Sequence, residues 1–313
     1  MLLPIKQPFH LAHSLESAQA FRWRPHGGGW YSGTIGGALF LLRQVPGGLA
    51  FRATAPHEEA VLALHSYFRL DDDLLHIYRS VNRDARIAAA LRRWWGMRLL
   101  RLDPWETLVS FLASMHSNVP RITRNVEAVA TALGEPVTLP GGPPHPWEGP
   151  PGPLPDGDST TVTRYTSITR HAFPPPERVA AASEGVLREL GLGFRAPFIA
   201  QAAEQVASGE VPLERLRTLP YEEAKALLLR LPGVGDKVAD CVLLLAGEKL
   251  DAFPIDRWVQ RALHEWYVGG MGLKRYRDLR AWAVGYFGPW AGYAQQYLFH
   301  HRRVGVGRGT SHG

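Results

Sequence analysis

The chain has 313 residues, of which 45% are hydrophobic and 20% are charged. This balance supports a packed core of one or two domains and excludes a wholly disordered chain. The longest apolar run, residues 242–246, is too short to cross a bilayer, and the first twenty residues lack the apolar stretch of a signal peptide. We therefore expect an intracellular protein with no membrane partner.

Charge and cysteine content narrow the possible partners and cofactors. The formal net charge is +6 and the pI is about 9.6, which suits a polyanionic partner. Cys241 is the single cysteine, which excludes an internal disulfide, a thiolate zinc site and a cysteine-ligated iron–sulfur cluster. We expect no metal and no cofactor. Only five of the 35 basic residues are lysine, so a lysine in an unusual setting is informative.

The region from Phe9 to Ala55 is predicted to form an antiparallel sheet. Short apolar and aromatic runs alternate there with turns that contain two or three consecutive glycines. The expected strands cover residues 21–23, 30–32, 38–42 and 49–51.

From His57 onward the apolar periodicity becomes helical. We expect an α+β fold, with an N-terminal antiparallel β domain and its following helices in residues 1–104 and a mainly helical body in residues 105–313. Asp103 and Pro104 supply a cap and a first-turn proline at the start of that body. The expected helices cover residues 57–68, 74–91, 105–115, 121–133, 176–190, 198–208, 221–230, 237–246, 257–267, 276–287 and 291–300.

Two segments lack periodicity. Residues 134–160 are rich in proline and glycine, and nine of the 25 prolines lie between Pro136 and Pro155. The composition favours a solvated connector over a ligand for proline-recognising domains. The polar tail, residues 302–313, is expected to be loose.

Residues 221–246 are predicted to form two helices joined by a tight hairpin, Leu-Pro-Gly-Val-Gly, at residues 231–235. A glycine hairpin that leads into a helix start presents free N–H groups, and these can bind a phosphate. We expect Gly233, Gly235 and Val238 to contribute such contacts. An ordinary helix–turn–helix connection is the alternative.

Lys237 lies in the first turn of the second helix, where a cation is disfavoured by the helix dipole. A helix start and partial burial both favour the neutral form of a lysine amine. A neutral amine is a nucleophile that can form a Schiff base. The alternative is a surface lysine that happens to follow Asp236.

Asp256 follows Phe-Pro-Ile and precedes a helical pattern, which is typical of a helix N-cap. A buried capping carboxylate can also stabilise developing positive charge or transfer protons. Direct contact with Lys237 would favour the charged amine, so we expect the two groups to lie near each other without a tight ion pair.

These residues resemble the helix–hairpin–helix DNA glycosylase superfamily, and more specifically its bifunctional 8-oxoguanine DNA glycosylase/lyases. The resemblance spans most of the chain and implies an N-terminal sheet joined to a helical body, with the active site in a cleft. The matching motifs lie, in order, at residues 19–23, 98–123, 190–195, 231–241, 254–256 and 288–299.

The resemblance assigns two catalytic residues and one wall of the base pocket. Lys237 matches the nucleophilic lysine of the family, and Asp256 matches its catalytic aspartate. Cys241 matches a cysteine that stacks against the damaged base, and its position one turn after Lys237 places both on one helix face. A buried small hydrophobic residue is the alternative for Cys241.

The resemblance also implies how the base is recognised. Gln295 matches the residue that contacts the base edge, and Phe299 matches the residue that covers the other ring face, although a plain core position is the alternative for Phe299. Ala18 replaces a family glycine whose backbone carbonyl accepts the proton that distinguishes the oxidised purine from guanine.

A third group of residues is implied to contact the DNA around the unpaired opposite base. Arg121, Phe194 and Arg195 match residues near an estranged cytosine, although solvated helix-end arginines are the alternative. His116 stands where the family carries asparagine and is expected to fill the gap left by the flipped base. Trp258 replaces a phosphate-binding histidine.

The resemblance implies a base-excision repair enzyme that flips 8-oxoguanine out of duplex DNA, releases it and cleaves the strand through a Schiff base. The expected partner is duplex DNA with an oxidised purine opposite cytosine. We expect a monomer located in the cytoplasm, associated with the nucleoid if the source is bacterial. A monofunctional alkylpurine glycosylase and a non-catalytic binder of damaged DNA are the alternatives.

Overall fold

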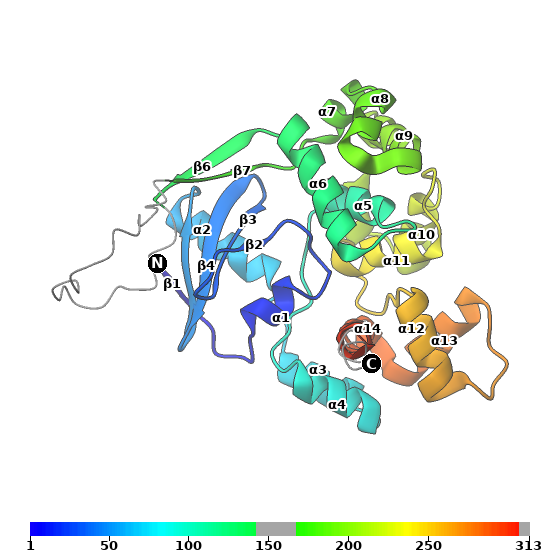
Figure 1. Cartoon of the computed structure of the whole chain (residues 1–313). Helices are drawn as coiled ribbons and strands as arrows, with labels where there is room; N and C mark the ends of the chain where they lie inside the picture. Colours follow the sequence, from blue (N-terminus) through cyan, green and yellow to red (C-terminus); the bar gives the residue numbers. More distant parts are fainter. Residues whose placement is uncertain (142–166, 307–313) are drawn as a thin grey trace, which may run out of the picture.

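The computed structural model describes residues 1–141 and 167–306. An antiparallel sheet lies on one side of the molecule and a body of helices lies on the other (Figure 1). The α+β fold class predicted from the sequence is confirmed.

The main sheet has five strands in the order β1-β5-β4-β3-β2, and all neighbouring strands are antiparallel. Gly33 in the third strand is required by packing, because a Cβ there would meet the Trp23 ring at 2.5 Å. The strands are β1 (Leu2–Pro4), β2 (Arg24–Pro25), β3 (Trp30–Ile35), β4 (Ala38–Val45) and β5 (Gly48–Ala53).

The prediction of a strand over residues 21–23 was wrong, since β2 begins only after these residues. The chain just before this segment is held by side-chain hydrogen bonds and not by a strand partner. The Gln19 amide donates to the carbonyl of Arg98 at 2.9 Å and accepts the N–H of Leu100 at 2.9 Å. These bonds to a distant segment override the local preference for extended pairing.

One face of the sheet is covered by α1 (Leu11–Leu15) and α2 (His57–Tyr67). The prediction that the region from Phe9 to Ala55 forms only strands was also wrong, because it contains the helix α1. Its first N–H donates to the Gln44 side chain at 2.8 Å, and its apolar residues cover the sheet. The buried residues of this layer include Leu11, Leu15, Phe40, Leu42, Phe51, Leu64 and Phe68.

The other face of the sheet is covered by a second, two-stranded sheet of β6 (Pro136–Pro140) and β7 (Ser167–His171). The expectation of irregular backbone over residues 134–160 was therefore wrong for β6, and residues 142–160 lie outside the described part. The alternating apolar residues of β6 gain burial against the main sheet. The contacts involve Leu139, Ile168, Trp30, Leu39 and Leu41.

The helical body contains most of the remaining elements, and short 3-10 or π turns connect several of them. Its helices are α3 (Leu74–Val81), α4 (Ala85–Arg93), α5 (Pro104–Ala113), α6 (Val119–Leu133), α7 (Pro176–Ala181), α8 (Glu184–Leu187), α9 (Ala196–Ala207), α10 (Tyr221–Leu228), α11 (Asp236–Leu245), α12 (Arg257–Leu263), α13 (Tyr276–Phe287) and α14 (Ala291–Val306).

Local capping explains where the expected helices change. The helix expected over 74–91 is divided, because the Asp84 carboxylate accepts N–H groups at the start of α4. The helix expected over 176–190 is interrupted before α8, which Ser183 caps. The tail was expected to be loose from residue 302, yet α14 continues to Val306. Residues 307–313 lie outside the described part.

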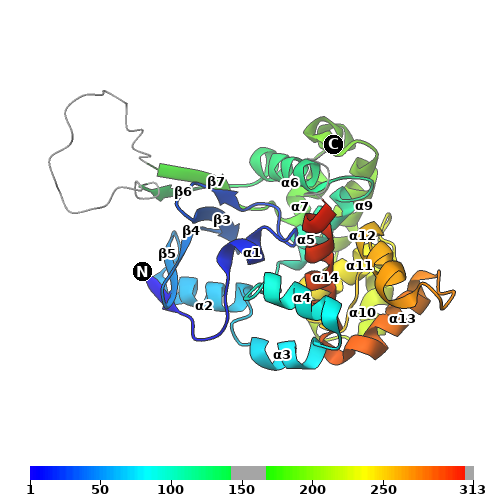
Figure 2. The same ribbon diagram turned by 60° about the horizontal axis from the view of Figure 1, so that its bottom comes forward.

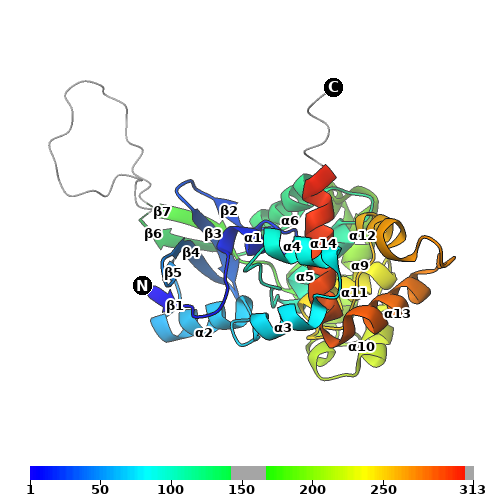
Figure 3. The same ribbon diagram turned by 90° about the horizontal axis from the view of Figure 1, so that it is seen from below.

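The centre of the body is formed by α5 and α11, which pack against each other. The long helix α14 lies between α4 and α12 (Figure 2, Figure 3). The apolar residues of α3 and α4 belong to the same cluster as those of α5 and α11. Across the described ranges, no helix combines the length and apolar character needed to cross a membrane.

Candidate active site

The connection between α10 and α11 is a tight hairpin that ends at the start of α11. Gly233 has φ +79°, and a Cβ at this residue would meet the Phe198 ring at 2.8 Å, so both backbone and packing require glycine. Gly235 is the exposed N-cap of α11, and a Cβ there would have no atom of the described chain within 4 Å. The first-turn N–H groups of α11 have no partner within the helix, so this open side can accept an anion.

Lys237 points from α11 toward the protein interior. Its Nζ donates to Ser114 Oγ at 3.0 Å and lies 4.9 Å from the centre of the Phe111 ring. Ser114 Oγ in turn donates to the carbonyl of Phe111 at 2.6 Å, so the hydroxyl has a fixed orientation. The sequence analysis did not identify Ser114, because 123 residues separate it from Lys237 and no local pattern connects them.

Asp256 caps α12 and lies near Lys237. Its Oδ1 accepts the N–H of Val259 at 2.8 Å. Burial raises the pKa of the Asp256 carboxyl above its ordinary value of 3.8, although the capping N–H groups and the Lys237 charge act in the opposite direction. The structure describes both side chains and places no ion pair between them within 4.0 Å. This arrangement agrees with the expected proximity without a tight pair.

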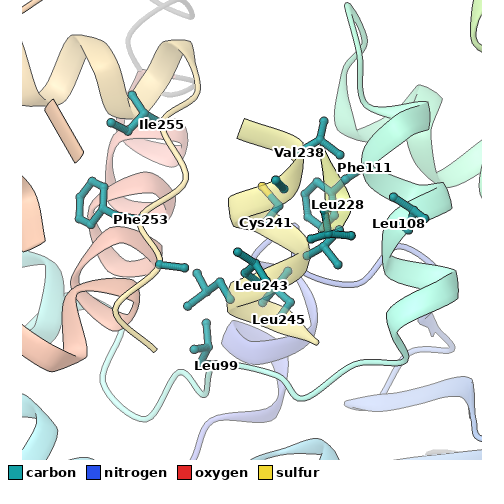
Figure 4. Packing of buried hydrophobic residues seen from close by; sticks show 14 of the residues in the cluster. Leu99, Leu108, Phe111, Leu228, Val238, Cys241, Leu243, Leu245, Phe253 and Ile255 are labelled. Carbon is teal, nitrogen blue, oxygen red and sulfur yellow. The ribbon is translucent and has the colours of Figure 1, made fainter. Parts of the chain in front are cut away.

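Cys241 lies one turn after Lys237 on α11 and is buried among apolar side chains (Figure 4). Burial is the main cause that raises the pKa of its thiol to about 12, with Lys237 opposing and the carboxylates of Asp240 and Asp256 adding to the shift. The thiol therefore stays protonated at neutral pH. It is suited to packing and not to nucleophilic attack.

Ala18, Gln295 and Phe299, which the resemblance assigns to the base pocket and which we call the pocket shell, come from the two ends of the chain. Gln295 is buried on α14, and its Nε2 donates to the carbonyl of Pro254 at 2.9 Å, two residues before Asp256. The next residue, Gln296, donates to the carbonyl that precedes Ala18 at 2.9 Å. The helix α14 thus joins the Ala18 loop to the segment that ends at Asp256.

Two features of the pocket shell were not expected from the sequence. Ala18 adopts φ +62°, a left-handed conformation that favours glycine. The Arg303 guanidinium lies 5.7 Å from the centre of the Phe299 ring and donates to the carbonyl of Glu16 at 2.9 Å. Burial lowers the pKa of Arg303, while the charge of Asp256 raises it. Arg303 therefore connects Phe299 with the loop before Ala18.

A separate cluster lies where the end of α5 and the start of α6 meet the turn before α9, and it contains His116, Arg121, Phe194 and Arg195. His116 is exposed and has φ +47°, and its ring centre lies 6.1 Å from that of Phe194, which is 49% exposed. Arg121 is exposed in the first turn of α6. The structure therefore gathers four residues that the resemblance assigned to the DNA interface.

Arg195 differs from the other members of this cluster because only 1% of its surface is exposed. Its guanidinium donates to the carbonyls of Met115, His116 and Leu192 at 2.6, 3.0 and 3.3 Å. Burial, followed by the charge of Arg121, lowers its pKa. In this arrangement, Arg195 supports the backbone that carries His116.

Trp258 is half-buried in the first turn of α12, and its backbone N–H donates to the Asp256 carboxylate that caps this helix. Within residues 1–141 and 167–306, no group of three or more His, Cys, Asp or Glu side chains is arranged to hold a metal ion.

Comparisons with known proteins agree with this geometry. Residues 1–108 match the profile of the 8-oxoguanine DNA glycosylase N-terminal domain. The chain is 32% identical to the N-glycosylase/DNA lyase OGG1 of Arabidopsis thaliana over 90% of its own length and 74% of the relative. It is 30% identical to a probable N-glycosylase/DNA lyase of Methanothermobacter thermautotrophicus over 75% and 72%.

A solved structure of the 8-oxoguanine glycosylase/lyase of Clostridium acetobutylicum extends this similarity to the whole fold. That protein was solved with double-stranded DNA that contains cytosine opposite 8-oxoguanine. The two chains are 25% identical and superpose with a TM-score of 0.82 over 98% of each.

Proposed function

Since the chain belongs to the 8-oxoguanine DNA glycosylases of the helix–hairpin–helix superfamily, we propose that Lys237 and Asp256 carry out its reaction. The protein removes 8-oxoguanine from duplex DNA in base-excision repair and has DNA lyase activity. The observation that supports these roles is the inward-facing Lys237 amine, 3.0 Å from Ser114 and close to the partly buried Asp256.

The first step of the proposed reaction is capture of the duplex and extrusion of the damaged base. Gly233, Gly235 and Val238 offer hairpin N–H groups to a backbone phosphate, and Trp258 lies at the next helix start. Extrusion of the base costs a few kcal/mol of stacking and pairing. His116 fills the space that the base leaves.

The pocket shell and Cys241 hold the extruded base. The Ala18 carbonyl accepts a hydrogen bond from the proton that distinguishes the oxidised purine from guanine, and Gln295 contacts the base edge. Cys241 and Phe299 cover the two faces of the ring. The buried, protonated thiol is suited to this contact because it adds no charge to the pocket.

The chemical step uses the amine and the carboxylate together. The Lys237 amine, once it has given up a proton, attacks the anomeric carbon, the glycosidic bond breaks, and the base departs with the bonding electrons and takes up a proton. The Asp256 carboxylate stabilises the positive charge that develops on the sugar. The amine then forms an imine with the opened sugar, and β-elimination breaks the bond to the 3′ phosphate.

The opposite strand is contacted by the second cluster. We propose cytosine as the preferred opposite base, with Arg121 and Phe194 as exposed contacts. Arg195 can reach that base only after its guanidinium leaves the three backbone carbonyls.

We further propose that the protein acts as a monomer. Residues 1–104 and 105–313 are the proposed domains, and the cytoplasm, at the nucleoid in a bacterial source, is the proposed location. The relatives with at least 30% identity are named N-glycosylase/DNA lyases, which favours the bifunctional enzyme over the alkylpurine and non-catalytic alternatives.

Borohydride trapping tests the role of Lys237. The wild type should form a covalent adduct with a duplex that contains 8-oxoguanine, and Lys237→Gln should lose the adduct and about 10³-fold or more of the strand cleavage. Lys249→Gln is the matched control, because the Lys249 amine donates to the Arg217 carbonyl away from the site. An adduct of equal yield with Lys237→Gln would refute the proposal.

A further inference from the structure

Asp240, which lies between Lys237 and Cys241 in the sequence of α11, has a buried carboxylate that the proposed reaction does not use. Asp240 on α11 is 0% exposed. Its Oδ1 accepts from the Tyr221 hydroxyl at 2.5 Å, and its Oδ2 accepts from the Tyr276 hydroxyl at 2.6 Å. A carboxylate with no exposure is stable only when it is paired and hydrogen-bonded, so these contacts define a built arrangement.

Cations from neighbouring helices balance the charge of Asp240. Lys225 Nζ of α10 lies 3.3 Å from Asp240 Oδ1 and 2.8 Å from Asp236 Oδ1. Arg280 of α13 lies 3.9 Å from Asp240 Oδ2, and its guanidinium stacks 3.7 Å from the centre of the Tyr221 ring. The carboxylate therefore links α10, α11 and α13.

The Tyr276 hydroxyl has a defined direction in this network. Burial, followed by the charge of Asp240, raises the pKa of Tyr276 far above its ordinary value, so the phenol keeps its proton and donates a hydrogen bond to Asp240. Its oxygen remains free to accept, and the N–H of Ile255 donates to it at 3.3 Å. A chain of hydrogen bonds thus runs from Ile255 through Tyr276 to Asp240.

Ile255 directly precedes Asp256, and Asp240 lies one turn after Lys237 on α11. The residue before Ile255 is held from the other side, because Gln295 donates to the Pro254 carbonyl. The extended segment that leads to Asp256 is therefore fixed by one side chain from α13 and one from α14. The contact from α13 also connects this segment to the helix of Lys237.

We propose that Tyr276 is a positioning residue, which holds the Asp256 carboxylate at a fixed distance from the Lys237 amine by bridging Ile255 and Asp240. The proposal rests on the proposed role of Asp256 in base release. Tyr276 touches neither DNA nor the reacting atoms in this scheme. Its effect on the rate passes entirely through the placement of Asp256.

Two single substitutions separate this role from simple stabilisation of Asp240. Tyr276→Phe removes a donor to Asp240 and also the acceptor for Ile255. Tyr221→Phe removes a donor to Asp240 and an acceptor for Lys225 but leaves the bond to Ile255 intact. We expect Tyr276→Phe to lower single-turnover release of 8-oxoguanine about 10-fold, with affinity for an abasic-analogue duplex unchanged. Tyr221→Phe should stay within about twofold of wild type. Equal losses in the two variants would overturn the proposal.

A double-mutant cycle with Asp256→Asn tests whether the effect passes through Asp256. In the Asp256→Asn background, Tyr276→Phe should change the remaining rate by less than about twofold. A further 10-fold loss would overturn the positioning role. The Asp256→Asn variant alone tests the proposed function. If it releases the base at the wild-type rate, the proposed role of Asp256 is refuted, and the positioning role of Tyr276 is refuted as well.

Hydrogen exchange of the wild-type protein keeps the proposal testable even if Tyr276→Phe does not fold. The Ile255 amide should exchange at least about 100-fold more slowly than an unprotected amide, because its N–H is held in the buried network. Exchange at the unprotected rate would overturn the proposal.

Discussion

The hairpin segment, residues 221–256, and the pocket shell contribute to the same site in different ways. The hairpin segment contains both proposed catalytic groups, Lys237 and Asp256, within a short stretch of chain. The pocket shell takes Ala18 from one end of the chain and Gln295 and Phe299 from the other. The proposed catalytic groups thus come from one short segment of the sequence, whereas recognition of the base depends on how distant elements pack.

The two regions also fix their geometry by different means. In the hairpin segment, local backbone conformation and capping fix the two helix starts, as at the positive φ of Gly233 and the N-cap of Asp256. In the pocket shell, buried side-chain amides are decisive, because Gln295 and Gln296 bond to carbonyls of distant segments. Substitutions of Lys237, Asp256 or Gly235 should therefore affect rate or DNA affinity most strongly, while substitutions in the pocket shell should act through stability and fit.

The largest effect is expected from Asp256→Asn. Asparagine is also a good N-cap, so α12 should keep its first turn while the negative charge is lost. We expect base release to fall about 10³-fold, measured under single-turnover conditions with a duplex that contains 8-oxoguanine. Wild-type activity should decline as the pH drops through the raised pKa of Asp256, and the variant should lack this dependence. A loss of less than about 10-fold would contradict the proposed role of Asp256 in base release.

A pair of hairpin variants should separate backbone strain from access to phosphate. Gly235→Ala meets no atom of the described chain within 4 Å, so it should fold normally but bind duplex DNA about 10-fold more weakly, because its methyl group lies where the phosphate approaches. Gly233→Ala should instead lower the free energy of unfolding by about 2 kcal/mol, owing to its positive φ and the Phe198 ring. DNA titrations and chemical denaturation measure the two effects. Unchanged DNA affinity in Gly235→Ala would contradict phosphate binding at the hairpin.

The raised pKa of Asp256 predicts a stability cost for the proposed catalytic carboxylate. The folded chain binds this proton more tightly than the unfolded chain, so stability falls as the pH rises from 3.8 through the raised value, and the full cost is present at neutral pH. Asp256→Asn should therefore have a higher Tm than wild type at pH 7. The difference should shrink as the pH is lowered toward 3.8, and a lower Tm of the variant at pH 7 would contradict it.

The smallest effect is expected in the pocket shell, at Ala18. Because Ala18 has φ +62°, Ala18→Gly should raise the free energy of unfolding by about 0.5 kcal/mol, the relief of strain exceeding the entropic cost of glycine. Ala20→Gly is the matched control, since Ala20 has no positive φ, and it should lower stability. Equal losses in the two variants would mean that Ala18 is not strained.

Local signals in the sequence determined the elements that depend on neighbouring residues. Turn glycines and apolar alternation predicted β3, β4 and β5, and helical periodicity with a cap predicted α5 and α11. The hairpin and the placement of Lys237 at a helix start were predicted for the same reason. Backbone geometry over a few residues depends mainly on those residues themselves.

Tertiary structure decided the contacts between residues far apart in the sequence. The pairing of β6 with β7, the bond between Lys237 and Ser114, and the contact of Tyr276 with Ile255 have no local signature. The missing strand at residues 21–23 has the same cause, because Gln19 binds a segment about 80 residues away. Such contacts form only when packing brings two surfaces together, and their geometry depends on every side chain between them.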